Sequence, residues 1–357
     1  MKFTIQLVMV LAVGLTLSSC KKENTAKTLP PPIPVTQTGP YLYVGGSTFT
    51  NGLYWKSSLH ENLAHPVPDT VAGSSNITAL LTSGKEVYMA GQTGGYYRND
   101  SFVAVTGAFI IQYIALSGVG LYATGFDNFG NLAYWQNNSE VNLENTVGRN
   151  LFPDEGVSNY RISGLALSGQ NQNVLISGSL FFENEPFTPD SVAEGNFGLL
   201  WNNGGVSVYG PGALVSSAFT CTVGVATIGS DVYVAGILPT LPARSDSGGY
   251  WKNGVWNSIN KGSFYPSSIA GFGSDIFIPA YIYTLTPTYS QQAAYWKNGT
   301  LVQLNGATAT AITVYNSDVY VLGIDQNDNL VVWKNGSLFE TLGSANTAMA
   351  TCLAIGD

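Results

Sequence analysis

The chain has 357 residues, and 45% of them are hydrophobic, so it can bury the core of one large all-β domain or of two smaller domains. Charged residues make up only 10%, whereas the chain contains 41 Gly, 20 Tyr and 16 Phe. This composition favours strands and tight turns over helices. The net charge of −8 argues against nucleic-acid backbones and anionic lipid headgroups as main partners.

The first 20 residues have the features of an export signal. Lys2 supplies a positive start, and residues 3–17 form an apolar run that is too short to span a bilayer comfortably. The run ends in Leu17-Ser18-Ser19-Cys20, which resembles a bacterial lipobox. The resemblance implies cleavage before Cys20 and lipidation of that cysteine. An ordinary secretory peptide that happens to contain a cysteine is the alternative.

Residues 21–40 are rich in proline and predict a tether between the anchor and a folded domain formed by residues 41–357. Lys21 stands where the inner-membrane retention signal familiar in enteric bacteria has Asp. We therefore expect a protein of the cell envelope that is lipid-anchored in the outer membrane. On this interpretation its only membrane contact is through the lipid on Cys20.

The rest of the chain repeats one motif seven times. The clearest copies are YWKNG at 250–254 and 295–299 and VWKNG at 332–336, and weaker copies begin at Tyr54, Tyr96, Tyr134 and Leu200. An apolar run ending in Gly or another small residue precedes each copy, and a further strand follows it. Units of four short strands and about 45 residues are typical of β-propellers, because a sheet that is apolar on both faces can bury them only between two neighbours.

The two ends of the repeat region support a closed ring. The first unit begins at Tyr41 without a leading strand, and residues 350–357 match that strand as it occurs at 309–316. We therefore predict an all-β, seven-bladed β-propeller with four antiparallel strands per blade, closed by the C-terminal strand completing the first blade. Unit four is the least regular, which leaves six or eight blades as alternatives. In unit one the fourth strand is expected to end at Leu63.

The repeated residues predict structural roles. Six of the seven tryptophans occupy one repeat position and are expected to pack between blades. The Asn-Gly pairs that follow suit type I′ hairpin turns, which need positive φ at both positions. The basic residues beside these turns form either a functional collar or stems lying over aromatic rings with their heads in water. These residues are Lys56, Arg98, Lys252, Lys297 and Lys334.

The connections between strands differ between the two faces of the predicted ring. Those joining strands one to two and three to four should all be short, and we call their side the short-turn face. Those joining strands two to three, and one blade to the next, define the long-loop face. They are long and irregular at 46–52, 126–131, 179–196, 237–247, 281–292 and 324–329, and at 64–75, 144–159 and 210–218. Variable loops on a rigid scaffold are where binding residues gather, so we expect the binding site on the long-loop face.

The candidate ligand-binding residues are aromatic and acidic side chains of these loops, a composition that suits sugars or peptides. Surface loops of ordinary composition are the alternative interpretation. The candidates are Phe181, Phe182, Glu183, Glu185, Phe187, Asp190, Tyr281, Tyr283 and Tyr289.

Catalytic and metal-binding motifs are weak. His60-Glu61 followed by His65 misses the zinc-binding HExxH spacing by one residue. Residues 325–329 resemble the start of a calcium loop, but Leu330 replaces the required Gly, so a plain Asx turn is expected. Cys221 and Cys352 fall in non-adjacent units and are expected to be buried thiols without a bridge. We therefore assign no catalytic residue, metal or cofactor.

The mature domain resembles the repeat β-propeller lipoproteins of bacterial envelopes with a YWKNG-type repeat. It is only loosely kelch-like, because paired glycines follow the second strand once, at Gly45-Gly46. The resemblance carries over no active-site residue. The sequence thus predicts a monomeric, non-catalytic recognition or scaffold module that binds a glycan or protein partner, but no nucleic acid, through the long-loop face. A polysaccharide hydrolase or lyase and a structural subunit of an envelope complex are the alternatives.

Overall fold

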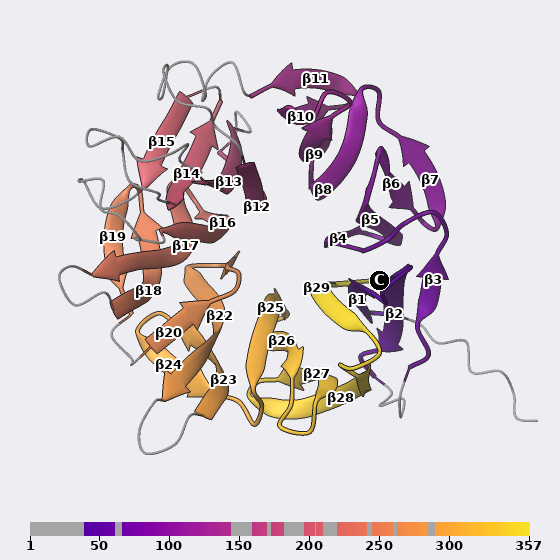
Figure 1. Cartoon of the computed structure of the whole chain (residues 1–357). Coiled ribbons are helices and arrows are strands. Elements are labelled where there is room, and N and C mark those ends of the chain that lie inside the picture. Colours follow the sequence, from indigo (N-terminus) through magenta and orange to yellow (C-terminus); the bar gives the residue numbers. More distant parts are fainter. Residues whose placement is uncertain are drawn as a thin grey trace, which may run out of the picture. The chain divides into compact units, whose positions relative to one another are not determined.

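The computed structural model describes residues 39–60, 66–143, 159–169, 173–181, 196–203, 205–209, 220–240, 245–259, 263–284 and 290–357. From Gly39 onward these residues form strands and turns, arranged as seven sheets around a ring (Figure 1). Within the described ranges there is no helix of the length and apolar character needed to cross a membrane. The predicted signal peptide, Cys20 and most of the tether lie outside the described residues.

Each sheet is one blade, and in blades two to seven the strands run outward from the ring axis in chain order, whereas blade one has the C-terminal strand innermost. Blade one contains β29 (Met349–Gly356), β1 (Tyr41–Ser47), β2 (Gly52–Ser58) and β3 (Asp69–Val71). Blade two contains β4 (Ala79–Ser83), β5 (Glu86–Thr93), β6 (Gly95–Arg98) and β7 (Ser101–Ala104). Blade three contains β8 (Ala108–Ser117), β9 (Gly120–Asp127), β10 (Leu132–Gln136) and β11 (Ser139–Asn142).

The other four blades follow the same order. Blade four contains β12 (Asn159–Ser168), β13 (Asn173–Phe181), β14 (Asn196–Asn202) and β15 (Gly205–Tyr209). Blade five contains β16 (Cys221–Ile228), β17 (Asp231–Thr240), β18 (Ser245–Lys252) and β19 (Val255–Ser258). Blade six contains the split inner strand β20 (Ser263–Pro266) and β21 (Ala270–Phe272), then β22 (Asp275–Thr284), β23 (Ser290–Lys297) and β24 (Thr300–Gln303). Blade seven contains β25 (Thr308–Tyr315), β26 (Asp318–Ile324), β27 (Asn329–Lys334) and β28 (Ser337–Ser344).

The C-terminal strand closes the ring, as predicted. β29 pairs antiparallel with β1 from Tyr41↔Gly356 to Ser47↔Met349 and supplies the inner strand of blade one. The Thr351 hydroxyl donates hydrogen bonds to Gly45 O, 3.2 Å away within this blade, and to Ile77 O at the entrance to blade two. The seven-blade count and the four-strand blades of the sequence prediction are therefore confirmed.

The repeated tryptophans form a buried layer between blades. Trp55, Trp135, Trp201 and Trp333 are at most 2% exposed, and each packs in a cluster that includes core residues of the preceding blade or its own. Burying an indole between sheets removes on the order of 200 Å² from water, which makes this position a main source of ring stability. Trp135 also donates a hydrogen bond from Nε1 to Thr106 O at 3.0 Å.

The seam between blades seven and one buries a carboxyl group. Glu340 of β28 is 4% exposed and shares a hydrogen bond with Ser57 of β2. Its second oxygen, Oε2, has no hydrogen-bond partner among the described atoms. Burial raises the pKa of Glu340, because desolvation penalises the charged form more than the Ser57 bond favours it.

Three details of the predicted strand layout are wrong. The fourth strand of blade one is β3, and the predicted strand end at Leu63 lies outside the described residues. The connection between Ser58 and Asp69 is therefore longer than the other connections from strand three to strand four, and these connections are not uniformly short. Ser57-Ser58 stands where other units have a turn pair, so β2 continues and pairs Ser58 with Tyr41. Residues 69–71, predicted to lie in a loop between blades, pair instead with Gly52 to Tyr54. Tyr281 and Tyr283 lie in β22 rather than in a loop, because aromatic and β-branched residues extend that strand to Thr284.

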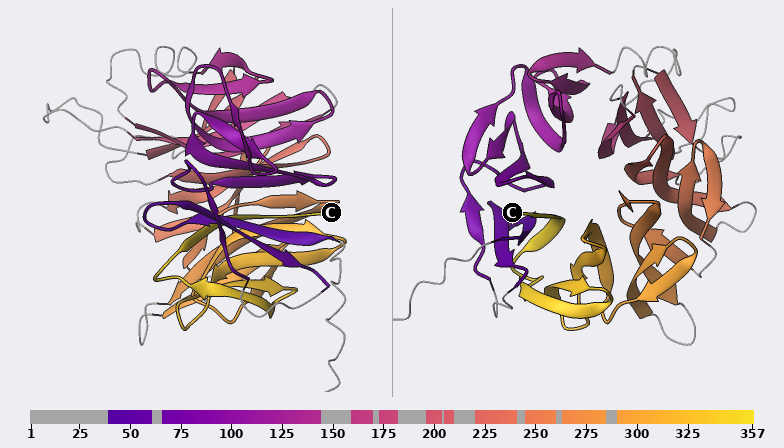
Figure 2. Two further views of the ribbon diagram at one scale, coloured as in Figure 1. Left: turned by 90° about the vertical axis from the view of Figure 1, so that its right-hand side faces the viewer. Right: turned by 180° about the vertical axis from the view of Figure 1, so that it is seen from behind.

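The chain enters the ring on the short-turn face. A Cβ atom built on Gly39 would lie 3.0 Å from the backbone carbon of Asp357, so the two ends of the described chain meet there. β1 then runs to the long-loop face, where residues 48–51 turn the chain into β2. Figure 2 shows the C-terminus on the side of the ring opposite this hairpin.

Candidate functional site

The short-turn face carries a brace that recurs in six blades. The first residue of each turn between the third and fourth strands is an asparagine in the left-handed region, for example Asn253 at φ +49° and Asn335 at φ +51°. In blade seven Asn335 Oδ1 accepts a hydrogen bond from Val319 N at 2.8 Å, and Nδ2 donates to Asp318 Oδ1 at 2.7 Å. The brace thus ties the turn between strands three and four to the start of strand two. The asparagine therefore both adopts the positive φ that the turn needs and fixes the turn against the start of strand two.

Three of the lysines beside these turns are held in ion pairs. Lys252, Lys297 and Lys334 bind Asp231, Asp275 and Asp318 at 2.7, 3.0 and 2.7 Å, and each ammonium also lies 5.1 to 5.4 Å from the centre of an aromatic ring. The hydrogen bond from each lysine holds the pKa of its aspartate below the usual range.

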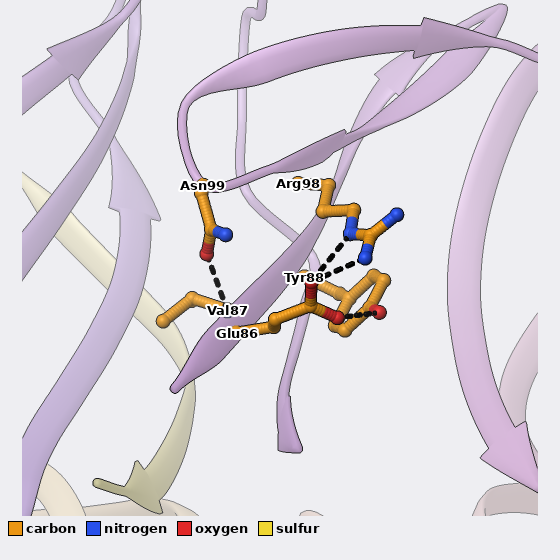
Figure 3. A network of polar contacts seen from close by, with 5 residues as sticks. All are labelled: Glu86, Val87, Tyr88, Arg98 and Asn99. Atoms are coloured by element: carbon orange, nitrogen blue, oxygen red, sulfur yellow. Dashed lines mark hydrogen bonds and ion pairs between the residues drawn. The ribbon is translucent and has the colours of Figure 1, made fainter. Parts of the chain in front are cut away.

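Blade two builds the same pairing from Glu86 and Arg98 (Figure 3). Arg98 Nε donates to Glu86 Oε1 at 3.0 Å, Tyr88 donates to Glu86 Oε2 at 2.5 Å, and Asn99 Oδ1 accepts from Val87 N at 2.9 Å. The Tyr88 bond is the main reason that the pKa of Glu86 is lowered.

The stem-over-aromatic interpretation therefore holds for the rim cations. Carboxylates rather than water receive the heads of Arg98, Lys252, Lys297 and Lys334. The exposed Lys56 has no such carboxylate among the described residues, and its ammonium lies 4.1 Å from the centre of the Tyr41 ring.

A cleft of about 240 Å³ opens between blades two and three on the short-turn face. It is lined by Tyr96, Leu121, Ala123, Trp135 and turn asparagines. Ala123 explains the space, because the same position of strand two holds Met, Ile or Val in the other blades. No predicted site residue lies there, so we interpret the cleft as a packing defect rather than as the site.

The described turns of the long-loop face are held by their own side chains. Asp127 Oδ1 accepts from Phe129 N and Asn131 N at 2.8 Å each, and Oδ2 accepts from Asn131 Nδ2 at 2.8 Å. Asp325 makes the same three bonds with Asn327 and Asn329. Residues 325–329 therefore form the Asx turn that was expected instead of a calcium loop. Among the described residues no group of His, Cys, Asp or Glu could hold a metal ion.

Two aromatic rings project from these turns into solvent. Phe49, between β1 and β2, is 98% exposed, and Phe129, between β9 and β10, is 90% exposed. Neither was among the predicted site residues. Each belongs to the long-loop face of its own blade.

Three tyrosines form a cluster at the long-loop end of blade six. Tyr265 of β20 stacks on Tyr281 of β22 with ring centres 5.2 Å apart and planes 7° apart, and Tyr283 meets both rings edge-on at 5.2 and 5.0 Å. All three side chains are half-buried. Burial, assisted by the neighbouring phenols, raises the pKa of Tyr281 to about 12. The Tyr281 phenol therefore stays protonated at neutral pH and can donate a hydrogen bond beside an apolar ring face.

The structure thus brings Tyr281 and Tyr283 together and adds Tyr265, which the sequence analysis missed. The missed signal is the alternation Ser263-Phe264-Tyr265-Pro266, in which Phe264 is buried and Tyr265 stands opposite Tyr281. Phe181 is the last residue of β13, and only its backbone belongs to the part of the chain that the structure describes. The remaining candidates, Phe182, Glu183, Glu185, Phe187, Asp190 and Tyr289, also lie outside the described residues.

The two described cysteines are unbridged thiols, as predicted, but they are half-buried rather than fully buried. Cys221 begins β16 of blade five, and Cys352 lies in β29 of blade one, so the two occupy non-adjacent blades. Burial raises the pKa of the Cys352 thiol to about 12. This thiol therefore stays protonated and is a poor nucleophile.

No protein-family model matches the sequence, and no curated protein matches it. Among solved structures, the chain is similar to the computationally designed Ika8 protein, at 13% identity over 88% of this chain and 90% of that one, with a TM-score of 0.47. It is also similar to the Dos1 propeller, at 11% identity over 87% and 88%, with a TM-score of 0.42. A third similarity, to TolB from Acinetobacter baumannii, has 9% identity over 88% of this chain and 66% of that one, with a TM-score of 0.44. These similarities concern the fold alone.

Proposed function

We propose that the protein is a non-catalytic recognition module that binds a glycan through its long-loop face. The tyrosine cluster of blade six carries the proposal. Stacked and edge-on rings give a flat apolar surface that suits the C–H face of a sugar, and the protonated phenol of Tyr281 at its border can donate to a sugar oxygen. A protein partner bound at the same face is the alternative outcome of the test below.

Proton-transfer chemistry fits the described part of this face less well. A glycosidase needs two carboxyl groups about 5–10 Å apart, one of them ready to give a proton. The carboxylate of Asp127 accepts three hydrogen bonds within its own turn, and so does the carboxylate of Asp325. A raised pKa likewise disfavours Tyr281 as the base of a lyase. The carboxylates between residues 183 and 194 lie outside the described part, so the hydrolase or lyase remains the rival.

The test replaces the cluster without disturbing the core. A Tyr281→Leu, Tyr283→Leu variant should lose binding in a glycan array and in titrations with the glycans that the wild type retains. Phe272→Ala is the matched control, because this 44%-exposed aromatic lies on the inner strand of the same blade at the short-turn end. Deleting residues 182–193 should also abolish capture without unfolding the ring. Undiminished binding by both long-loop variants would move the site elsewhere.

We also propose that the protein is anchored to the outer membrane by a lipid on Cys20. The entry of the described chain at Gly39, on the short-turn face, supports this arrangement because a tether attached there leaves the long-loop face unobstructed. Cys20→Ser should move the protein from the membrane fraction to the soluble envelope fraction and abolish labelling with radioactive palmitate. Retention in the membrane fraction after this substitution would refute the anchor.

A further inference from the structure

The tyrosine cluster lies at the seam between blades six and seven. Tyr281 stands opposite Ala293 of β23, and directly opposite residues of antiparallel strands share one face of a sheet. Ala293 is buried in a cluster that also contains Val331 of blade seven. Because the rings of Tyr265 and Tyr283 contact the Tyr281 ring, the whole cluster lies on the face of blade six that is turned toward blade seven.

One side chain of blade seven reaches across this seam. Gln326, in the turn between β26 and β27, donates from Nε2 to Gly306 O at 2.8 Å and to Gln291 O at 3.5 Å. Gly306 O also accepts a hydrogen bond from Ala293 N at 2.8 Å. Ala293 and Gln291 stand directly opposite the two β22 tyrosines of the cluster, and such partners lie about 5 Å apart. The Gln326 amide is therefore held beside the strand that adjoins these tyrosines.

The Gln326 amide is fixed in position and keeps an acceptor for a ligand. Both of its hydrogen bonds to described residues use Nε2, and Oε1 accepts none from them. The residue is exposed. An amide oxygen can accept hydrogen bonds from hydroxyl groups. Because Nε2 already anchors the side chain, a ligand that donates to Oε1 does not have to immobilise it.

The described part of this seam offers no positive charge on the long-loop face. There the described loops and strand ends of blades six and seven contain two charged residues, Asp325 and Asp328. Lys297 and Lys334 of the same blades lie beside the short turns and are held in ion pairs. Since like charges repel, two carboxylates at this place disfavour an anionic sugar and leave a neutral one favoured.

We propose that Gln326 is a second binding residue of the glycan site and that the ligand is a neutral saccharide held at the seam of blades six and seven. The sugar ring packs on the tyrosine cluster, and one of its hydroxyl groups donates a hydrogen bond to Gln326 Oε1. This assignment rests on the proposed glycan-binding function and specifies the ligand class and the contribution of a second blade to the site.

The experiment compares neutral and acidic sugars on the mature protein. The neutral probes are the methyl glycosides of glucose, galactose, mannose and N-acetylglucosamine, and the acidic probes are the methyl glycosides of glucuronate and galacturonate. Binding is followed by saturation-transfer NMR and calorimetry. Gln326→Met keeps the length of the side chain but removes its amide. Gln303→Met is the matched control, because Gln303 lies exposed on the outer strand opposite Ala294, which packs toward blade five.

The wild type should bind a neutral sugar more tightly than the acidic sugars, and added NaCl should not weaken that binding. Gln326→Met should weaken it roughly threefold to tenfold, as loss of one neutral hydrogen bond predicts, whereas Gln303→Met should leave it unchanged. Urea unfolding of both variants shows whether the ring is intact. The comparison of neutral with acidic sugars on the wild type tests the ligand class without any substitution.

Two outcomes would overturn this inference and leave the glycan proposal standing. One is neutral-sugar binding that Tyr281→Leu, Tyr283→Leu abolishes but Gln326→Met retains in full. The other is binding of the acidic sugars as tight as that of the neutral ones, with the same dependence on the tyrosines. Binding of none of these sugars by the wild type, or binding that neither the tyrosine variant nor Gln326→Met changes, would overturn both the inference and the glycan site on which it rests.

Discussion

Replacing Glu340 by Gln should stabilise the closed ring at neutral pH, and the gain should disappear in acid. Glu340 lies at the seam of blades seven and one, 4% exposed, with Ser57 as partner of one oxygen and none for Oε2 among the described atoms. Gln keeps the shape and an acceptor for Ser57 but carries no charge. The variant therefore isolates the cost of burying a carboxylate at the point where the ring closes.

The sign follows from the direction of the pKa shift. Burial raises the pKa of folded Glu340 above its ordinary value of 4.5. Below pH 4.5 both folded and unfolded chains are protonated there, and the residue costs little. As pH rises from 4.5 through the raised folded value, the unfolded chain ionises first, so wild-type stability falls and then levels off. Each unit by which burial raises the pKa of Glu340 costs about 1.4 kcal/mol of stability once the carboxyl is ionised, and Glu340→Gln should recover that cost at pH 7 because Gln stays neutral.

Urea unfolding of both proteins from pH 4 to pH 8, followed by tryptophan fluorescence, measures the difference in unfolding free energy. Taking the difference cancels the other titrating groups. Glu140→Gln is the matched control, because Glu140 lies on the outer strand of blade three and is exposed, and it should change stability by less than about 0.5 kcal/mol. A Glu340→Gln gain that stays constant across this pH range, or a loss at pH 7, would refute the reasoning.

Three further predictions concern the ring. Asn335→Ala should lower the free energy of unfolding in urea by about 1–3 kcal/mol, because it removes two hydrogen bonds and places Ala at a φ of +51°. Asn335→Gly should recover part of that loss, because Gly adopts positive φ without strain. Equal losses in the two variants would mean that the positive φ does not matter. Ala123→Val should raise Tm by filling the cleft between blades two and three, at about 0.5–2 kcal/mol; a lower Tm would show that the neighbouring side chains cannot accept the added methyl groups. Hydrogen bonds from the lysines lower the pKa of the rim aspartates, so the stability that these pairs contribute is lost as the pH falls through the lowered pKa values. A variant with all three rim aspartates replaced by Asn should therefore show a flatter loss of Tm below pH 4 than the wild type. An unchanged dependence of Tm on pH would contradict the pairing. The aspartates replaced in that variant are Asp231, Asp275 and Asp318.

The fold was predictable because the residues that recur in each unit have the same structural role in each blade. A Trp at a fixed position must pack between sheets, and an Asn-Gly pair must turn the chain, so seven copies predict seven blades. Blade one departs from the repeat and could not be predicted in the same way. Ser57 and Ser58 give no turn signal, and only the structure shows that β3 forms at residues 69–71 after a long connection.

The site was less predictable because it consists of departures from the repeat. Tyr281 and Tyr283 were found as aromatic residues, but their stacking on Tyr265 depends on the register of β20 against β22.

The closure of blade one also sets the order in which the molecule can be completed. The bond from Thr351 to Gly45 O joins residues 306 positions apart, so β1 is synthesised first and waits for almost the whole chain before its inner edge is covered. An unpaired strand edge is a template for binding other strands. During biogenesis the inner edge of β1 therefore stays unpaired until β29 has been synthesised. A chaperone that covers this edge would control when the ring closes.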